Sequence, residues 1–329
     1  NTLLCKITNY WRFNNDKLIF GYSNIILYIC EMKLLYLMPH CSTGGMPQYT
    51  LKQALSFKDI FDISIIEVNY YGDMFVVQRN QFKQNFNFRS LYGKEERLKQ
   101  DILDINPDII HIQEVPETFL NKDSLEFLYN KSRNWNIVVT THSSLTRKKD
   151  FTYIPDRIVT VNNWQKELFQ KEFPETEIDM WEYPIEDKCS AFEKLNAKAK
   201  LGLDSRNNRL NILNVGLFTP GKNQGELFEI ARKNPQNTYH FVGNQAPNFE
   251  YYWKPLMKNI PRNCKVWGET SDVDLFYKAC DEFYFTSKFE LNPIVIKEAL
   301  SYGLPVKMRK LETYGDFYDN NPLVTYIND

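Results

Sequence analysis

The sequence lacks the features that mark several classes of protein. Its longest uninterrupted apolar run, in the segment KLIFGYSNIILYICE, has only six residues, whereas a membrane-spanning helix needs about 20. Six cysteines are scattered along the chain, with neither a CxxC pair nor a Cys/His cluster. This favours a reducing compartment and argues against a structural zinc site. The chain also lacks a GxGxxG run, so dinucleotide oxidoreduction is poorly supported.

Charge of either sign is not in excess. Lysine and arginine total 40 and aspartate and glutamate total 41, which gives a net charge of −1. This balance leaves no global bias towards nucleic acid or an anionic membrane, and we expect no nucleic-acid partner. With 329 residues, of which 43% are hydrophobic and 25% charged, the chain is long enough for two globular domains with cores of their own.

The first 31 residues differ from the rest. The chain opens on Asn1, and no small-residue cleavage site of a signal peptide follows. A clean apolar strand begins directly after Met32. We interpret residues 1–31 as an upstream or non-native extension, with Met32 as the natural start. The alternative is a short leader that touches a membrane.

From residue 32 onwards, apolar strands alternate with helical segments. Strands are expected in 33–38, 62–70, 107–115 and 136–144, and the cycle restarts at 210–218. Continuously apolar strands separated by helices are typical of a parallel sheet covered on both faces. The sequence therefore predicts an α/β fold class with two Rossmann-like domains facing a cleft. We place these domains at residues 32–184 and 185–329, with ligands at the carboxyl ends of the strands.

The segment FELNPIVIKEALSYGLPV, residues 289–306, predicts a helix of about ten residues. Asn292 suits the N-cap and Pro293 the first helical position. Gly303 suits the position after the C-cap, and Pro305 prevents the helix from continuing.

Two glutamates flank the start of this helix. Ile296, Ala299 and Leu300 share one helical face, whereas Glu298 lies roughly opposite and Glu290 precedes the cap. The unpaired N–H groups of a first helical turn bind phosphate through the backbone alone. The two carboxylates would then suit the hydroxyls of a sugar and of a ribose. The alternative is that neither glutamate binds a ligand. Glu298 would then be solvated, and Glu290 would be favoured only by the dipole at the helix N-terminus.

The second half resembles the C-terminal domain of the GT-B glycosyltransferases, specifically the retaining family-4 type known as glycosyl transferases group 1. The resemblance runs in order through NVGLFTPGKNQ, FVGN, VWGE and DLFYKACDEFYFTSKFELNPIVIKEALSYGLPV. It covers about 110 residues and includes the family's Glu-x7-Glu signature as Glu290 and Glu298. In the first half, MPHCSTGGMPQYTLKQAL is similar to the family's glycine-rich first loop, and VVTTHSS to its Thr-x-His-x-Ser element.

This resemblance implies roles for residues in the second half. Glu298 would bind the ribose of the nucleotide, and Lys222 would neutralise the donor diphosphate. Glu290 would bind the transferred sugar together with the chain after it. That following stretch contributes the donor-binding candidates Leu291, Asn292 and Ile294.

The resemblance implies roles in the first half as well. Gly44 and Gly45 would let the backbone approach the donor, and His142 would touch the sugar near the reacting carbon. His111, at another strand end, receives no role. The catalytic set is thus Glu290, Lys222 and His142.

The activity implied is transfer of a sugar, with retention, from a nucleoside-diphosphate sugar to a hydroxyl of a glycan, lipid or protein acceptor. The leaving diphosphate would help to deprotonate the acceptor, without a metal or a cofactor. A cytoplasmic enzyme is expected, with peripheral membrane contact as an alternative.

One position departs from the family pattern. The family usually places an arginine in the loop that carries the lysine, and Leu217 stands there in VGLFTPGK. Loss of that cation weakens stabilisation of the departing diphosphate. Arg147 or Lys288 would then have to replace it, or activity is weak. The alternative function is therefore an inactive nucleotide-sugar or glycan-binding protein of the same fold.

Two further features bear on these expectations. Asp272 and Asp274 imitate a metal-binding Asp-x-Asp, but they precede a helix, and we interpret them as a capping box with Ser271 at the N-cap. The family would also continue with further helices beyond LVTYIND, so we expect a truncated C-terminus.

Overall fold

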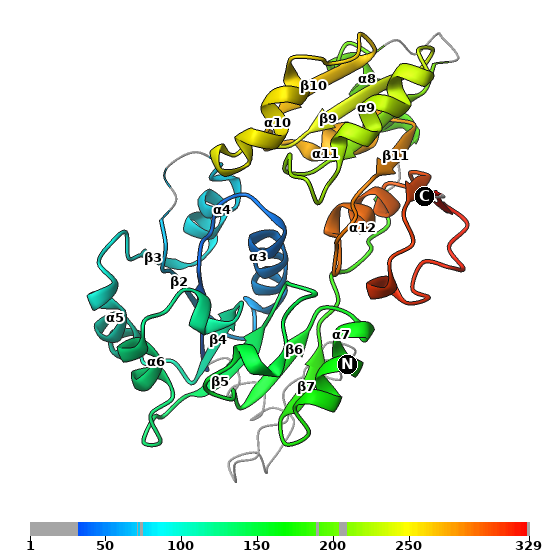
Figure 1. Ribbon diagram of the computed structural model, residues 1–329. Helices are drawn as coiled ribbons and strands as arrows, with labels where there is room; N and C mark the ends of the chain where they lie inside the picture. The colour runs from blue at the N-terminus through cyan, green and yellow to red at the C-terminus, as the bar shows by residue number, and fades with distance from the viewer. Residues whose placement is uncertain (1–31, 71, 73–74, 189–190, 204–208, 328–329) are drawn as a thin grey trace. The chain divides into compact units, whose positions relative to one another are not determined.

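The computed structural model describes residues 32–70, 72, 75–188, 191–203 and 209–327. The chain divides into two compact units between Trp181 and Glu182 (Figure 1). This division lies close to Pro184, where the sequence analysis joins its two domains. The predicted extension at residues 1–31 lies outside the described residues.

The first unit is built on a sheet of seven parallel strands in the order β3-β2-β1-β4-β5-β6-β7. Its strands are β1 (Lys33–Met38), β2 (Asp62–Glu67), β3 (Asn87–Ser90), β4 (Ile109–Gln113), β5 (Asn136–Thr140), β6 (Arg157–Thr160) and β7 (Glu177–Met180). The two central strands are almost wholly buried. This explains why their apolar runs are continuous rather than alternating.

Helices cover both faces of this sheet. They are α3 (Gly45–Phe57), α4 (Val77–Asn85), α5 (Leu98–Ile105), α6 (Lys122–Leu128) and α7 (Asn163–Glu172). On one face, Leu51 of α3 and Phe82 of α4 share a core with Tyr36. On the other, Ile102 of α5 shares a core with Leu35, as do residues of α6 and α7. Figure 1 shows α3 and α5 on opposite sides of the strands.

The second unit repeats this plan with a sheet of six parallel strands in the order β10-β9-β8-β11-β12-β13. These strands are β8 (Asn211–Val215), β9 (Thr238–Val242), β10 (Cys264–Gly268), β11 (Glu282–Phe285), β12 (Val306–Met308) and β13 (Val324–Tyr326). The helices are α8 (Ala191–Lys200), α9 (Gln224–Lys233), α10 (Glu250–Met257), α11 (Val273–Ala279) and α12 (Ile294–Ser301). The predicted α/β fold with two parallel sheets is therefore confirmed.

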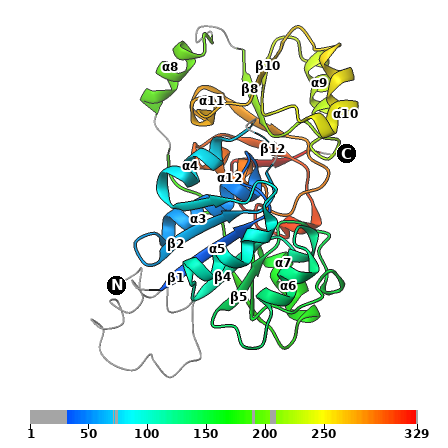
Figure 2. The ribbon, with the colours of Figure 1, turned by 90° about the vertical axis from the view of Figure 1, so that its left-hand side faces the viewer.

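The helices of the second unit also form two layers. Residues of α9 and α10 pack against one face of the sheet, around Phe241. Residues of α11 and α12 pack against the other face, around Phe283. Figure 2 shows α9 and α10 on one side of the strands and α11 on the other.

Short turns complete both units. They are η1 (Glu95–Arg97), η2 (Pro116–Thr118), η3 (Lys148–Asp150), η4 (Pro247–Phe249) and η5 (Glu312–Tyr314). Within the described part of the chain, no helix combines the length and the apolar character needed to cross a bilayer.

Each sheet has a point where the order of its strands reverses. In the first unit β1 lies between β2 and β4, so the chain crosses first to one side and then to the other. In the second unit β8 occupies the same position between β9 and β11. Open parallel sheets bind their ligands at the carboxyl ends of the strands beside this reversal.

Two predicted helix starts are wrong by one residue. Helix α12 begins at Ile294, with Pro293 as its N-cap, rather than with Asn292 at the cap. Pro293 has an extended ψ of 107°, so the helix begins one residue later than the fixed φ of proline alone suggested. Helix α11 is capped by Asp272 rather than Ser271, because the Asp272 carboxylate accepts a hydrogen bond from the Leu275 N–H at 3.3 Å.

The helix has eight residues rather than about ten, but its predicted apolar face and its predicted end are confirmed. Ile296, Ala299 and Leu300 all lie in the hydrophobic core. Gly303, just after the C-cap Tyr302, has a φ of 69°, a left-handed conformation that glycine adopts without strain.

Strands β8 and β9 end on glycines that touch. A Cβ atom on Gly243 would lie 2.0 Å from the carbonyl oxygen of Gly216, and the φ of Gly243 is 147°. No side chain fits at this position.

Gly243→Ala is therefore expected to destabilise the protein by about 1–3 kcal/mol, a typical cost of overpacking. The measurement is the thermal midpoint, which should fall by several degrees. Gly221→Ala is the matched control, because its Cβ would meet only the Thr219 hydroxyl at an ordinary 3.8 Å. Equal midpoints for the two variants would show that the β8–β9 ends separate without cost.

Candidate functional site

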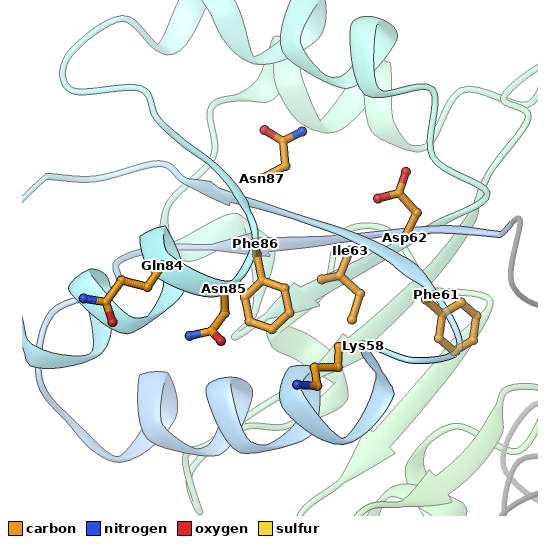
Figure 3. A pocket seen from close by; sticks show the side chains of 8 residues that line it. All are labelled: Lys58, Phe61, Asp62, Ile63, Gln84, Asn85, Phe86 and Asn87. Atoms are coloured by element: carbon orange, nitrogen blue, oxygen red, sulfur yellow. The ribbon is translucent and has the colours of Figure 1, made fainter.

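One surface hollow of the first unit lies away from the strand ends that bind ligands in such sheets. It has a volume of about 510 Å³. Figure 3 shows that Asp62 and Asn87, the first residues of β2 and β3, line it. Because these are the amino ends of the strands, we look for the site at the opposite edge of each sheet.

In the second unit, the loop between β8 and α9 lies at the strand-order reversal. The Thr286 hydroxyl, just after β11, donates to the carbonyl oxygens of Lys222 at 3.0 Å and Asn223 at 3.1 Å. The Lys288 N–H donates to the Gly221 carbonyl at 2.8 Å. These hydrogen bonds tie the loop to the chain that leads from β11 into α12.

Lys222 and Glu290 form an ion pair with each other. The Lys222 Nζ donates to Glu290 Oε1, and it lies 5.4 Å from the centre of the Phe285 ring. The lysine side chain is 30% exposed and the glutamate side chain 11% exposed. The Glu290 carbonyl also accepts from the Thr313 hydroxyl at 2.6 Å. A cation and an anion thus lie together, partly shielded from water and anchored by the backbone.

The structure places the remaining donor-binding candidates of this unit around the start of α12. Leu291 and Ile294 are buried, with 5% and 9% of their surface exposed, and Asn292 is half-buried. Leu291 and Asn292 belong to the turn after Glu290, and Ile294 is the first residue of α12.

Glu298 is held by two tyrosines. Its carboxylate accepts from the Tyr277 hydroxyl at 2.9 Å and from the Tyr183 hydroxyl at 3.5 Å. Glu298 is half-buried, and burial raises the pKa of its carboxyl. It therefore lies outside the apolar core face of α12, as the helical wheel indicates, but it is fixed rather than freely solvated.

In the first unit, Gly44 is the N-cap of α3 and Gly45 is its first residue. Both glycines are exposed. A Cβ on Gly45 would meet nothing within 4 Å, and one on Gly44 would meet only Pro47 at 3.7 Å. Packing within the protein therefore does not require glycine at these two positions. Close approach of a ligand to the backbone would explain why both residues are glycine.

A buried ion pair supports the loop before these glycines. Glu67, at the end of β2, accepts from the Cys41 N–H at 2.7 Å and pairs with Arg79 at 2.8 Å. Both charged side chains are almost fully buried. The sequence analysis missed this pair, although a glutamate ending an apolar strand was a visible signal.

His142 follows β5 at the carboxyl edge of the first sheet. Its ring Nε2 lies 3.1 Å from Gln113 Oε1, and Tyr49 contacts it edge-on with ring centres 4.9 Å apart. Burial lowers the pKa of His142 to about 3, so the ring is neutral at pH 7. Because Gln113 Oε1 only accepts hydrogen bonds, Nε2 carries the proton.

His111 serves the core instead. It is completely buried in β4, its Nε2 lies 2.8 Å from the Thr140 hydroxyl, and its ring stacks on Tyr36. Burial lowers its pKa to about 3. The structure thus gives His111 a packing role.

Glu114, the residue after β4, is a second acid that the sequence analysis missed. Its φ of 83° is left-handed, which is rare for a residue with a side chain. Its Oε2 accepts from the His142 N–H at 3.3 Å. Burial raises the pKa of Glu114 to about 7. No sequence pattern signalled this backbone conformation.

Comparisons with known proteins bear on the whole arrangement. Residues 196–317 match the family model described as glycosyl transferases group 1. The matched segment lies wholly within the second unit. It contains the Lys222–Glu290 pair, Glu298 and all of α12.

Two curated relatives are similar to part of the chain. One is the alpha-galactosylglucosyldiacylglycerol synthase of Streptococcus pneumoniae, 27% identical over 136 residues, which are 39% of this chain and 36% of that protein. The other is the processive diacylglycerol alpha-glucosyltransferase of Acholeplasma laidlawii, 26% identical over 144 residues, which are 43% of this chain and 41% of that protein. These alignments span less than half of either relative.

Solved structures show the fold of nearly the whole chain. The structure of Anabaena HepE in complex with UDP and glucose has a TM-score of 0.68 at 16% identity, covering 90% of this chain and 86% of that one. A glycosyltransferase from Rickettsia africae also has a TM-score of 0.68 at 16% identity, with coverages of 91% and 84%. The two units therefore have the GT-B glycosyltransferase fold.

Within the segment that matches the family model, Leu217 is half-buried and its carbonyl accepts from the Gln224 side chain at 3.0 Å. Lys288 is exposed and lies three residues after β11. Its backbone N–H donates to Gly221 in the loop that also contains Lys222. Arg147 belongs to the first unit, where its guanidinium donates to the carbonyls of Ser144 and Thr146. Of the two replacement cations considered from the sequence, the structure brings Lys288 to the loop of Lys222.

The raised pKa of Glu114 predicts a pH-dependent contribution to stability. An unfolded glutamate loses its proton near pH 4.5, and folded Glu114 keeps its proton until about pH 7. Between these values the folded state binds more protons, so stability falls as pH rises through this window.

Glu114→Gln removes the titration, so the variant should gain stability relative to the native protein from pH 4.5 to pH 7.5. We expect about 1 kcal/mol or more, since one pKa unit corresponds to roughly 1.4 kcal/mol. The measurement is the difference in thermal midpoint between the two proteins at each pH. A constant difference across the window would show that Glu114 ionises normally.

Proposed function

We propose that this protein is a retaining glycosyltransferase that moves a sugar from a nucleoside-diphosphate sugar to an acceptor hydroxyl. The acceptor classes are a glycan, a lipid or a protein. The observation that carries the proposal is the Lys222–Glu290 ion pair, at the strand-order reversal of the second unit and beside the start of α12.

The proposed donor site separates three tasks. Lys222 neutralises the diphosphate, together with backbone N–H groups around Leu291, Asn292 and Ile294. Glu298 binds the ribose hydroxyls, for which its tyrosine contacts hold it in place. Glu290 exchanges its lysine partner for the sugar when the donor binds.

In the proposed reaction, the bond between the anomeric carbon and the diphosphate oxygen breaks while the acceptor oxygen bonds to the same face of that carbon. The hydroxyl proton passes to the departing diphosphate. Lys222 stabilises the negative charge that develops there, and Glu290 stabilises positive charge on the sugar ring. Gly44 and Gly45 admit the donor, and the neutral His142 contacts the sugar. The proposal assigns no metal and no cofactor.

The names of the curated relatives favour a lipid-linked acceptor, because both contain diacylglycerol. We therefore propose a cytoplasmic enzyme that contacts a membrane peripherally to reach its acceptor.

A second candidate function follows from Leu217. Without a second cation in this loop, the domain would bind a nucleotide sugar or a glycan but transfer slowly or not at all. Release of nucleoside diphosphate with formation of a glycosylated product separates the enzyme from the binding protein.

Lys222→Ala is expected to weaken UDP binding and to slow turnover of UDP-glucose together. A charged hydrogen bond contributes roughly 1.5–3 kcal/mol, or about ten- to a hundredfold in affinity. Lys222→Arg should keep part of both, since the diphosphate needs a positive charge. Calorimetry and steady-state kinetics measure these effects.

Lys254→Ala is the control, because Lys254 pairs only with Glu250 on the exposed surface of α10. If Lys222→Ala bound UDP and turned over as well as this control, Lys222 would not belong to the donor site.

Glu290→Gln and Glu298→Gln are expected to fail differently. Glu298→Gln should weaken binding of UDP and of UDP-glucose alike, by about tenfold or more, because both ligands contain the ribose. Glu290→Gln should leave UDP binding nearly intact and lower kcat, because its contact is made as charge develops on the sugar. Calorimetric titration with UDP, beside single-turnover rates with UDP-glucose, compares the two. Identical profiles for both variants would refute the division of roles.

A further inference from the structure

Glu114 has a backbone conformation that its residue type disfavours. It is the first residue after β4, and its N–H continues the strand ladder by donating to the Thr140 carbonyl at 2.7 Å. Its φ of 83° suits glycine, because a Cβ atom crowds the backbone in this region. Strained residues of this kind persist where the surrounding structure holds them, and they cluster at functional sites.

No structural role accounts for its carboxylate. Glu114 is half-buried, and the one hydrogen bond that its carboxylate accepts from the described residues is the long contact from the His142 N–H at 3.3 Å. Among the described residues, no lysine or arginine forms an ion pair with it, and the neighbouring His142 ring is neutral. Glu114 neither caps a helix nor balances a charge.

The side chains around Glu114 form a hydrogen-bonding set at the strand-order reversal between β1 and β4. Gln113 is fully buried, and its Oε1 accepts from the Thr50 hydroxyl at 3.1 Å. Its Nε2 has no hydrogen-bond partner among the described residues. A carboxylate acceptor thus lies beside the His142 segment, whose ring is held by Gln113. Sugar hydroxyls, which both donate and accept, match this combination.

We propose that Glu114 binds the hydroxyl of the acceptor that receives the sugar. Its carboxylate accepts a hydrogen bond from that hydroxyl and orients the oxygen, while the proton leaves with the departing diphosphate. The acceptor class that fits is a polyol, such as the sugar headgroup of a glycolipid. This assignment rests on the proposed transferase function, and it gives Glu114 a catalytic role in the first unit that is separate from donor binding.

Two substitutions at Glu114 test the assignment by changing different properties of the residue. Glu114→Gln keeps the shape and removes the charge, whereas Glu114→Gly removes the side chain and relieves the backbone. Asn106→Gly is the matched control, because Asn106 also has a left-handed backbone, with a φ of 50°, at the C-cap of α5. Both glycine variants should keep or raise the thermal midpoint.

Kinetics with UDP-glucose and octyl glucoside as acceptor are expected to separate the variants. Both Glu114 variants should raise the acceptor KM or lower kcat by tenfold or more, with UDP affinity within twofold of the native protein. Asn106→Gly should match the native protein in every constant. Acceptor constants within twofold of native for both Glu114 variants overturn the assignment and leave the transferase function standing.

A binding measurement keeps the test independent of turnover. Octyl glucoside below its micelle concentration is titrated into each protein and followed by NMR. If the native protein turned over no donor, tenfold weaker glucoside binding by Glu114→Gln would still support the polyol site, and the transferase proposal alone would fail. Equal binding by both proteins, or none by either, would overturn the assignment.

Discussion

Parallel pairing of the strands is the constraint on which the rest of this structure depends. It brings the carboxyl ends of all strands in a sheet to one edge, and the reversal of strand order leaves space there between two loops. In the second unit, that edge brings Lys222 and Glu290 into contact across 68 positions of sequence. In the first, it brings Glu114 to His142. In each unit, the charged and polar candidate residues therefore lie at the carboxyl edge of that unit's own sheet.

Several of these groups are placed at a cost to stability. Burial raises the pKa of Glu298 and Glu114 and lowers that of His142, so each would ionise more easily in water. Glu114 adds a left-handed backbone. By contrast, the Glu67–Arg79 pair under the glycine loop is satisfied on both sides, as expected for a support. Desolvation at all three groups, and backbone strain at Glu114, thus occur where ligands are proposed to bind.

The sequence predicted the buried strands at the centre of each sheet but missed both edge strands of the first. Strand β1 was found with its exact bounds as 33–38, because it is continuously apolar. The edge strands β3 and β7 carry polar, partly exposed residues and gave no apolar run. Within the candidate site, the family motifs indicated the right loops and glutamates. The Lys222–Glu290 contact and the left-handed backbone of Glu114 could not be predicted from the sequence, because tertiary packing alone creates them.

We propose that the protein transfers a sugar from a nucleotide donor bound at the strand-order reversal of the second unit. The most direct test is to incubate the protein with a panel of nucleoside-diphosphate sugars and polyol acceptors, and to measure released diphosphate and glycosylated product together. The account predicts equal amounts of both from one preferred donor, with the anomeric configuration of that donor retained in the product by NMR. Release no faster than with Lys222→Ala, for every donor, would contradict it.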